Sequence, residues 1–316
     1  MGHLVLTTIG IVALVVAAVA LAARYIPSVS HPVLITATFA PYLMLGAPAA
    51  VIVFAALRNW PVVALAGALA IATAAVQLPW QVATKAAGQS TVRVVSANLW
   101  YGRADPAAVV RLAVQHADIL AVQELTPKLA DELSTAGIDD TFPYHALRAR
   151  EGPAGVGVWS RYPMHRGKEY DEFWLGLLTA HVRVPGTSHE ATVVTAHMSA
   201  PWPEPIHSWR ADMAQLRDTL PAIGASASGA VIFAADLNAT PDHLEFRRLL
   251  RGGYRDAAAQ AGAGMTRTFP GAARRPPALF ALDHILTRKC TARAVKTVAI
   301  AGSDHHALVS DIVVQP

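Results

Sequence analysis

The sequence predicts an α+β protein in which two mostly antiparallel β-sheets pack face to face with helices outside, preceded by three transmembrane helices. The membrane part is predicted because the apolar excess, 53% of 316 residues overall, is concentrated near the N-terminus. The sheets are predicted because strand-like stretches outnumber helical ones in the remainder, and hairpin turns join many of them. A fully parallel sheet would instead need a crossover helix between each pair of strands.

The N-terminal part has the composition of a membrane domain. Its first 84 residues contain no acidic side chain and only two basic ones, Arg24 and Arg58. Residues 4–23 are uncharged, and a helix of that length spans about 30 Å, the thickness of a bilayer core. Residues 33–57 and 62–78 are the second and third expected spans. We therefore expect a multi-pass protein of the cell membrane.

A linker at residues 85–90 and a globular domain at residues 91–316 follow the membrane domain at residues 1–84. Subtracting the two arginines from 26 basic residues leaves 24, against 22 acidic ones, in the part beyond the membrane domain. This near balance gives no argument for a polyanion-binding surface. The single cysteine, Cys290, excludes an intrachain disulfide, and the lack of a Cys cluster or an HExxH helix argues against a zinc protease. Charge counts leave the orientation of the spans open.

The globular domain reads as alternating apolar strands and amphipathic helices. Strands are expected at residues 91–98, 118–124, 144–148, 155–160, 177–184, 191–197, 231–236, 279–287, 294–300 and 307–314. Helices are expected at residues 107–116, 126–134, 209–220 and 243–250. Pro185-Gly186 is typical of a hairpin turn between two of the strands.

Polar residues end six of these strands or loops. They are Asn98, Glu124, His197, Asp236 with Asn238, Asp283, and Asp304 with His305. A single polar strand end is usually a turn former. Six of them in one domain, all Asn, Asp, Glu or His, indicate a site, because buried carboxylates must be paired or hold a metal. Oxygen ligands of this kind suit Mg²⁺ or Mn²⁺.

The ordered motifs around these residues resemble the endonuclease/exonuclease/phosphatase superfamily, which includes deoxyribonuclease I, exonuclease III and neutral sphingomyelinases. The motifs are Ser-Ala-Asn98-Leu, Val-Gln-Glu124, Gly-Val-Trp-Ser-Arg161-Tyr-Pro, Thr-Ala-His197, Ala-Asp236-Leu-Asn238, Leu-Asp283-His and Ser-Asp304-His305. The resemblance covers about residues 92–314. It implies a four-layered αββα sandwich, as in deoxyribonuclease I, and a metal-dependent hydrolase acting on phosphoester bonds.

The resemblance also implies which residues hold the metal. Glu124 is implied to be the main ligand of Mg²⁺ or Mn²⁺, with Asn98 and Asp304 beside it. Trp100 stands where some nucleases of the family carry an acid, so a second metal ligand is not implied at that position. One metal or two therefore remains open.

The remaining motif residues are implied to be catalytic. Asp236 would orient or deprotonate the attacking water, while Asn238 and His197 would contact the phosphate oxygens. His305 would donate to the phosphoryl oxygen or act as acid and base, and Asp283 would hold its tautomer. Phosphoester hydrolysis needs such a positioned nucleophile and such donors.

The spans before the domain resemble VanJ-type teicoplanin-resistance membrane proteins. This likeness implies an extracytoplasmic domain that removes phosphate from a membrane lipid carrier such as undecaprenyl pyrophosphate, and hence a role in antibiotic resistance. The expected partners are the lipid bilayer and a lipid-linked phosphorylated substrate. A membrane-anchored nuclease acting on nucleic acid, a sphingomyelinase-like phospholipid phosphodiesterase and an inactive membrane binding module are the alternatives.

Overall fold

The computed structural model describes residues 1–86, 88, 90–274 and 277–315, and the chain divides into two compact units. Unit 1 comprises Met1–Pro79 and Thr240–Arg247, and unit 2 comprises Trp80–Ala239 and Arg248–Pro316. The predicted linker at residues 85–90 includes positions 87 and 89, which lie outside the described residues. The domain boundaries drawn from composition therefore stay a prediction.

Unit 1 is mainly helical. Its helices from the N-terminal part are α1 Gly2–Ala23, α2 His31–Thr38, α3 Ala40–Leu43, α4 Gly46–Ala56 and α5 Trp60–Gln77. The stretches Gly2–Ala23 and Trp60–Trp80 are long and apolar enough to cross a membrane. Between them, α2 and the following helical stretch are bent by 64°, so a third span exists only if this pair counts as one. Pro41 contributes to the break, because proline has no backbone N–H for a continuing helix.

Small residues allow α1 and α4 to approach closely. A Cβ added to Gly10 would lie 2.7 Å from the Phe54 ring, and one on Gly46 would lie 2.4 Å from the Ala13 carbonyl oxygen. Close approach through glycine and alanine is typical of helices that associate within lipid. Large apolar side chains such as Ile52 remain exposed on the outside of the unit, as a lipid-facing surface requires.

Unit 2 contains two six-stranded mixed sheets. The first has the order β11-β12-β1-β2-β4-β3, with strands Cys290–Ala299, His306–Val314, Ser90–Asn98, Ile119–Gln123, Val156–Ser160 and Tyr144–Arg148. The second has the order β5-β6-β7-β8-β10-β9, with strands Met164–Glu169, Leu177–Val182, Ala191–His197, Val231–Asp236, Asp283–Arg288 and Arg255–Asp256. β1 and β2 run parallel, as do β7 and β8, and the other neighbours are antiparallel.

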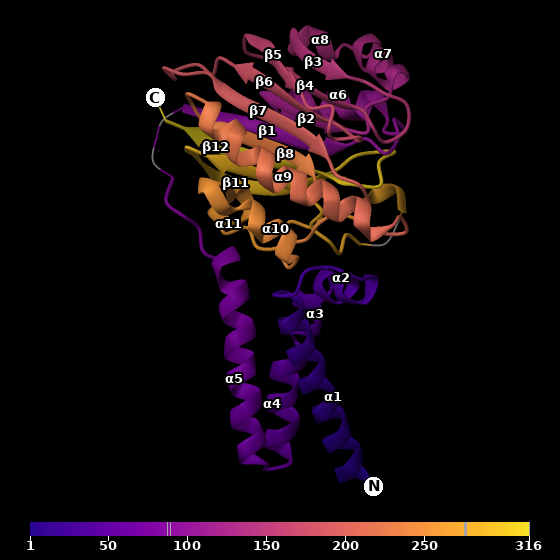
Figure 1. Cartoon of the computed structure of the whole chain (residues 1–316), viewed down its shortest axis with the longest axis vertical. Helices are drawn as coiled ribbons and strands as arrows, with labels where there is room; N and C mark the ends of the chain where they lie inside the picture. Colours follow the sequence, from indigo (N-terminus) through magenta and orange to yellow (C-terminus); the bar gives the residue numbers. More distant parts are fainter. Residues whose placement is uncertain (87, 89, 275–276, 316) are drawn as a thin grey trace. The chain divides into compact units, whose positions relative to one another are not determined.

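The main core lies between the two sheets, where Val94, Ile119, Val193 and Ile232 belong to one buried apolar cluster. A second cluster packs the first sheet against helices α6 Pro106–His116, α7 Pro127–Thr135 and α8 Ile138–Thr141. Helices α9 Ile206–Ser226 and α11 Ala257–Ala261 lie on the other side of unit 2, and the short α10 spans Leu244–Leu249 (Figure 1). The α+β class is confirmed, and the layers are consistent with the expected sandwich.

Several boundaries differ from expectation for identifiable reasons. β5 was not anticipated, because its sequence Met-His-Arg-Gly-Lys-Glu lacks an apolar face, which is typical of a protected edge strand. α9 runs from Ile206 to Ser226 through Pro221, whereas the predicted helix ended at residue 220. β10 begins only at Asp283, because Phe280 forms an isolated bridge with Phe269 before the strand starts.

Candidate active site

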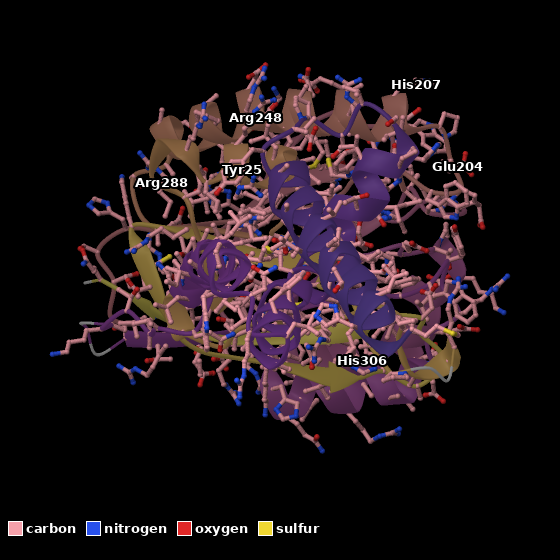
Figure 2. The ribbon with its side chains drawn as sticks, turned by 90° about the horizontal axis from the view of Figure 1, so that it is seen from below. Tyr25, Glu204, His207, Arg248, Arg288 and His306 are labelled. Atoms are coloured by element: carbon pink, nitrogen blue, oxygen red, sulfur yellow. The ribbon has the colours of Figure 1, made fainter. Side chains whose placement is uncertain are left out.

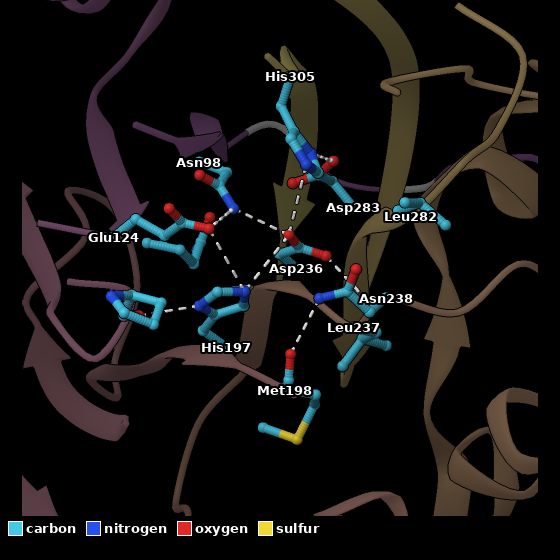
Figure 3. A network of polar contacts seen from close by, with 12 residues as sticks. Asn98, Glu124, His197, Met198, Asp236, Leu237, Asn238, Leu282, Asp283 and His305 are labelled. Carbon is cyan, nitrogen blue, oxygen red and sulfur yellow. Dashed lines mark hydrogen bonds and ion pairs between the residues drawn. The ribbon is translucent and has the colours of Figure 1, made fainter. Parts of the chain in front are cut away.

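The register of the sheets brings the predicted polar strand ends to one place. Asn98 pairs with Gln123 across the parallel strands β1 and β2, so Glu124 follows directly beside it. His197 pairs with Asp236 across β7 and β8, and Asp283 pairs with Asp236 across β10 and β8. The two sheets thus contribute residues to a single polar group, which Figure 3 shows from close by.

Asn98 bridges the two sheets within this group. Its Nδ2 donates to Glu124 Oε1 and to Asp236 Oδ2, each at 2.9 Å (Figure 3). Its Oδ1 accepts from the backbone N–H of Trp100 at 2.9 Å. The amide therefore points its nitrogen at the carboxylates, while its oxygen is held by the following loop. Its role as a metal ligand stays a prediction.

Left-handed backbone conformations gather at the site. Glu124, Trp100, Tyr101 and Asn238 have φ values of 60°, 47°, 51° and 47°. Non-glycine residues rarely adopt positive φ, and such strain tends to occur at functional sites. Here it serves hydrogen bonding, because the Tyr101 N–H donates to Glu124 Oε2 at 2.6 Å.

Asn238 is held by the same loop that carries Asp236. Its backbone N–H donates to Asp236 Oδ1 and its Nδ2 donates to the Met198 carbonyl, both at 2.9 Å. Asn238 is half-buried, whereas Asp236 is buried. One hydrogen of the Asn238 amide is therefore used within the protein, and the other is left for the proposed phosphate contact.

His197 faces the carboxylates with one ring nitrogen only. Its Nδ1 lies 3.0 Å from the Pro153 carbonyl oxygen, which requires that Nδ1 carry the proton. Its Nε2 lies 3.7 Å from Glu124 Oε1 and 3.6 Å from Asp236 Oδ2. The Pro153 carbonyl thus orients the ring so that Nε2 points into the site.

Asp283 and His305 form a buried pair. His305 Nδ1 lies 2.7 Å from Asp283 Oδ2, and His305 Nε2 lies 3.7 Å from Asp236 Oδ2. Burial alone would lower the pKa of His305, but the carboxylates of Asp283 and Asp236 outweigh it and raise that pKa to about 10. We therefore expect His305 to be an imidazolium at neutral pH, suited to donating a proton.

The pKa values of two carboxylates in the group are also raised, which favours their neutral form. Burial, with a contribution from the charge of Asp283, raises the pKa of Asp236. Burial also raises the pKa of Glu124, although His197 and the hydrogen bond from Asn98 oppose the shift. Strongly shifted acids and bases in one buried cluster are typical of catalytic sites.

The donor set fits a hard divalent cation. Glu124, Asp236, Asp283 and Asp304 are each buried, and Asp283 Oδ1 has no hydrogen-bond partner among the described residues. A buried, unpartnered carboxylate oxygen is costly unless a cation completes it. Ligand atoms of Asp236, Asp283 and His305 lie within 4.8 Å of one another. Because Asp283 already binds His305 Nδ1, we read these three as a proton-handling group rather than as a complete metal site.

Three residues with roles at the site were missed from sequence. Gln123 donates through Nε2 to Thr195 Oγ1 at 3.1 Å and to the Ala234 carbonyl at 3.3 Å, which links the sheets. Trp209 Nε1 donates to the Leu237 carbonyl at 3.0 Å, between the two predicted catalytic residues. Arg274 donates to Asp304. Of these three residues, only Gln123 had a signal in the sequence, because it directly precedes Glu124 at the end of a predicted strand.

Two other histidines are partly or fully exposed. His207 is exposed on α9 and is labelled at the edge of the chain in Figure 2. His306 is half-buried and follows His305 in the chain. Trp174 and Trp202 are 70% and 63% exposed.

Comparisons with known proteins agree with this geometry. The sequence profile described as the Endonuclease/Exonuclease/phosphatase family matches residues 95–305. A comparison with curated protein sequences gives no match.

Solved structures with a similar fold include a family member from Bacteroides vulgatus, at 15% identity and a TM-score of 0.58, covering 72% of this chain and 100% of that chain. Humanized TDP2 of D. rerio matches at 19% identity and a TM-score of 0.57, covering 71% of this chain and 99% of that chain. A mannosyl-6-phosphatase of Bacteroides thetaiotaomicron matches at 14% identity and a TM-score of 0.53, covering 70% of this chain and 99% of that chain. At these identities the likeness shows a shared fold.

Proposed function

The protein belongs to the endonuclease/exonuclease/phosphatase family, and from this premise we propose that it is a membrane-anchored, metal-dependent phosphoesterase acting on a lipid-linked phosphate. Members of the family hydrolyse phosphoester bonds, and the chain is a hydrolase of this class. One observation supports the proposal of a membrane-anchored enzyme with a lipid-linked substrate. The same chain carries a buried acid–base group and helices apolar enough to cross a membrane.

Hydrolysis forms a bond between the water oxygen and phosphorus, breaks the bond from phosphorus to the leaving oxygen, and moves one proton to that oxygen. We assign the removal of the water proton to Asp236, because burial makes its carboxylate a stronger base than an exposed aspartate. We assign proton donation to His305, which Asp283 keeps charged and correctly oriented. The doubly protonated form of His197, with Nδ1 on the Pro153 carbonyl and Nε2 facing the site, and the amide of Asn238 are the proposed donors to the phosphate oxygens.

We assign the metal to Glu124, Asn98 and Asp304. When bound, Mg²⁺ or Mn²⁺ would neutralise charge that develops on the phosphate oxygens. Tyr101 N–H and Asn98 Nδ2 fix both oxygens of Glu124, so its carboxylate is already oriented within the site.

A lipid carrier of the undecaprenyl pyrophosphate type is the substrate we favour, with the catalytic domain on the extracytoplasmic side and a role in glycopeptide resistance. The resemblance of the N-terminal spans to those of VanJ-type proteins is the basis for this choice. The balanced charge of the globular part speaks against a nuclease, because phosphate-backbone binding needs a basic surface.

The test offers detergent-solubilised protein a polyprenyl pyrophosphate, plasmid DNA and sphingomyelin in parallel, with Mg²⁺ or Mn²⁺. Asp236→Ala is the inactive control. Phosphate release from the prenyl substrate alone is expected. DNA nicking that Asp236→Ala abolishes would show that the protein is a nuclease instead. If none of the three substrates is turned over with metal present, the remaining alternative is an inactive membrane binding module. A reporter fused to the C-terminus and active only in the cytoplasm should be silent if the domain is outside.

A further inference from the structure

A half-exposed arginine lies beside the catalytic group. Arg274 ends a 3-10 turn, Ala272–Arg274, in the segment that precedes β10. Its Nε and Nη2 donate to Asp304 Oδ2 at 3.0 and 2.9 Å, and half of its side chain is exposed to solvent. One edge of the guanidinium is therefore held by the protein, while solvent still reaches the side chain.

Two aromatic rings lie beside this guanidinium. Arg274 lies 5.5 Å from the centroid of the Trp100 ring and 5.6 Å from that of Phe269. Phe269 in turn lies 5.0 Å from the ring of His305. Arg274 and His305 thus both lie beside Phe269, and Asp304, the partner of Arg274, is the residue before His305.

The backbone holds the Arg274 segment against the His305 loop. The His306 N–H donates to the Thr268 carbonyl at 2.8 Å, and the Ala273 N–H donates to the Ser303 carbonyl at 3.2 Å. A Cβ on Gly271 would lie 2.6 Å from backbone atoms of His305, so only glycine permits this approach. The position of Arg274 is consequently set by the same loop that sets the proposed proton donor.

We propose that Arg274 binds a second phosphate of the substrate, adjacent to the one that is attacked, so that the site selects a diphosphate over a monophosphate. This inference rests on the proposed function. A planar guanidinium pairs with phosphate oxygens through two parallel N–H groups, which suits a group fixed in orientation. Because Asp304, the partner of Arg274, directly precedes His305, a substrate with two adjacent phosphates is expected to contact both side chains.

The surroundings favour a phosphate over a nucleobase at this position. Base recognition in single strands relies on open aromatic faces. The Trp100 ring instead has the guanidinium groups of Arg103 and Arg274 over it, at 4.8 and 5.5 Å from its centroid. Two cations at one edge of the site present positive charge to an anionic group.

The test measures binding of two probes that the enzyme cannot hydrolyse, methylenediphosphonate and methylphosphonate, to the full chain in detergent with Mg²⁺. Calorimetric titration gives both dissociation constants for the wild type, Arg274→Ala, Arg274→Lys and Arg293→Ala. Arg293 is exposed on β11, six residues before Ala299, which pairs with His306, and its replacement makes the same change in net charge.

Arg274→Ala should weaken diphosphonate binding tenfold to a hundredfold and methylphosphonate binding less than threefold, as the loss of charge-assisted hydrogen bonds predicts. Arg274→Lys should be intermediate, because it keeps the charge without the planar fork, and Arg293→Ala should change neither. The proposal would be overturned if Arg274→Ala weakened the binding of both probes equally or of neither. It would also be overturned if the wild type bound the diphosphonate no more tightly than methylphosphonate. A single-stranded oligonucleotide is titrated as a third probe, and a loss in Arg274→Ala confined to that probe would also overturn the proposal, because it would indicate nucleic-acid binding.

The two proposals fail separately. If the ratio of the two probes' dissociation constants depends on Arg274 but prenyl diphosphates are not hydrolysed, the proposal of a lipid substrate is wrong and the proposal of a diphosphate site stands. If prenyl diphosphate and monophosphate are hydrolysed equally well by the wild type and by Arg274→Ala, the phosphoesterase proposal stands and the role of Arg274 is wrong.

Discussion

Replacing His284 with leucine is expected to destabilise unit 2 strongly, because this buried imidazole joins three segments. His284 Nδ1 lies 2.9 Å from Asp256 Oδ2, and Nε2 lies 2.8 Å from the Ala239 carbonyl oxygen. Both partners only accept, so the ring must carry both protons and a positive charge. Burial alone would lower the pKa of His284, but its bond and charge interaction with Asp256 raise it.

The cost follows from breaking a buried ion pair on one side. Asp256 is 2% exposed and also accepts from the N–H groups of Ala258 and Ala259 at the start of α11. His284→Leu leaves this carboxylate without its cation, which costs roughly 3–5 kcal/mol. For a domain of this size about 1 kcal/mol shifts Tm by about 2–4 °C, so a fall of roughly 6–20 °C is expected.

Thermal unfolding of the full chain in detergent, followed by near-ultraviolet circular dichroism at several pH values, measures this effect. His207→Leu is the matched control, because His207 is exposed. A histidine with a raised folded-state pKa stabilises fully below about pH 6.5, and this contribution is lost as pH rises through the folded-state pKa. The difference in Tm between wild type and His284→Leu should therefore shrink at high pH. A loss no larger than that of His207→Leu, or one that grows with pH, would refute the reasoning.

Two further predictions concern the site itself. Asp283 helps to raise the pKa of His305 to about 10, so activity that needs the imidazolium should fall only as pH rises through that value. In Asp283→Asn the basic limb of the pH profile of kcat/KM should therefore move to lower pH. A basic limb at the wild-type position would contradict the pairing of Asp283 with His305. Gln123→Leu should lower the free energy of unfolding by roughly 1–3 kcal/mol, because the Thr195 hydroxyl and the Ala234 carbonyl lose a buried partner; denaturant titration checks this, and an unchanged midpoint would contradict it.

The α+β class and most strand positions were predictable because apolar runs and turn residues are local signals. The polar residues that the structure brings together were predictable for a related reason. Each of them interrupts or ends an apolar stretch, as Asp236 does after the run 231–235. Parallel neighbours such as β7 and β8 then place their ends side by side.

What could not be predicted depends on contacts between distant residues. The bond from Arg274 to Asp304 joins positions 30 apart, and that from Gln123 to Thr195 joins positions 72 apart. Nothing in the neighbourhood of Arg274 distinguishes it from a surface arginine. The bend between α2 and the next helical stretch was missed because hydropathy records composition and not the geometry of the backbone.

The rate of phosphate release from a polyprenyl diphosphate, with Mg²⁺ present, tests the central proposal most directly when wild type and Asp236→Asn are compared. Asp236→Asn keeps the shape of a side chain that accepts from Asn238 N–H but removes the base. We predict a fall in kcat of at least about a hundredfold, as the loss of a general base implies. Release by Asp236→Asn at the wild-type rate would contradict catalysis at this site.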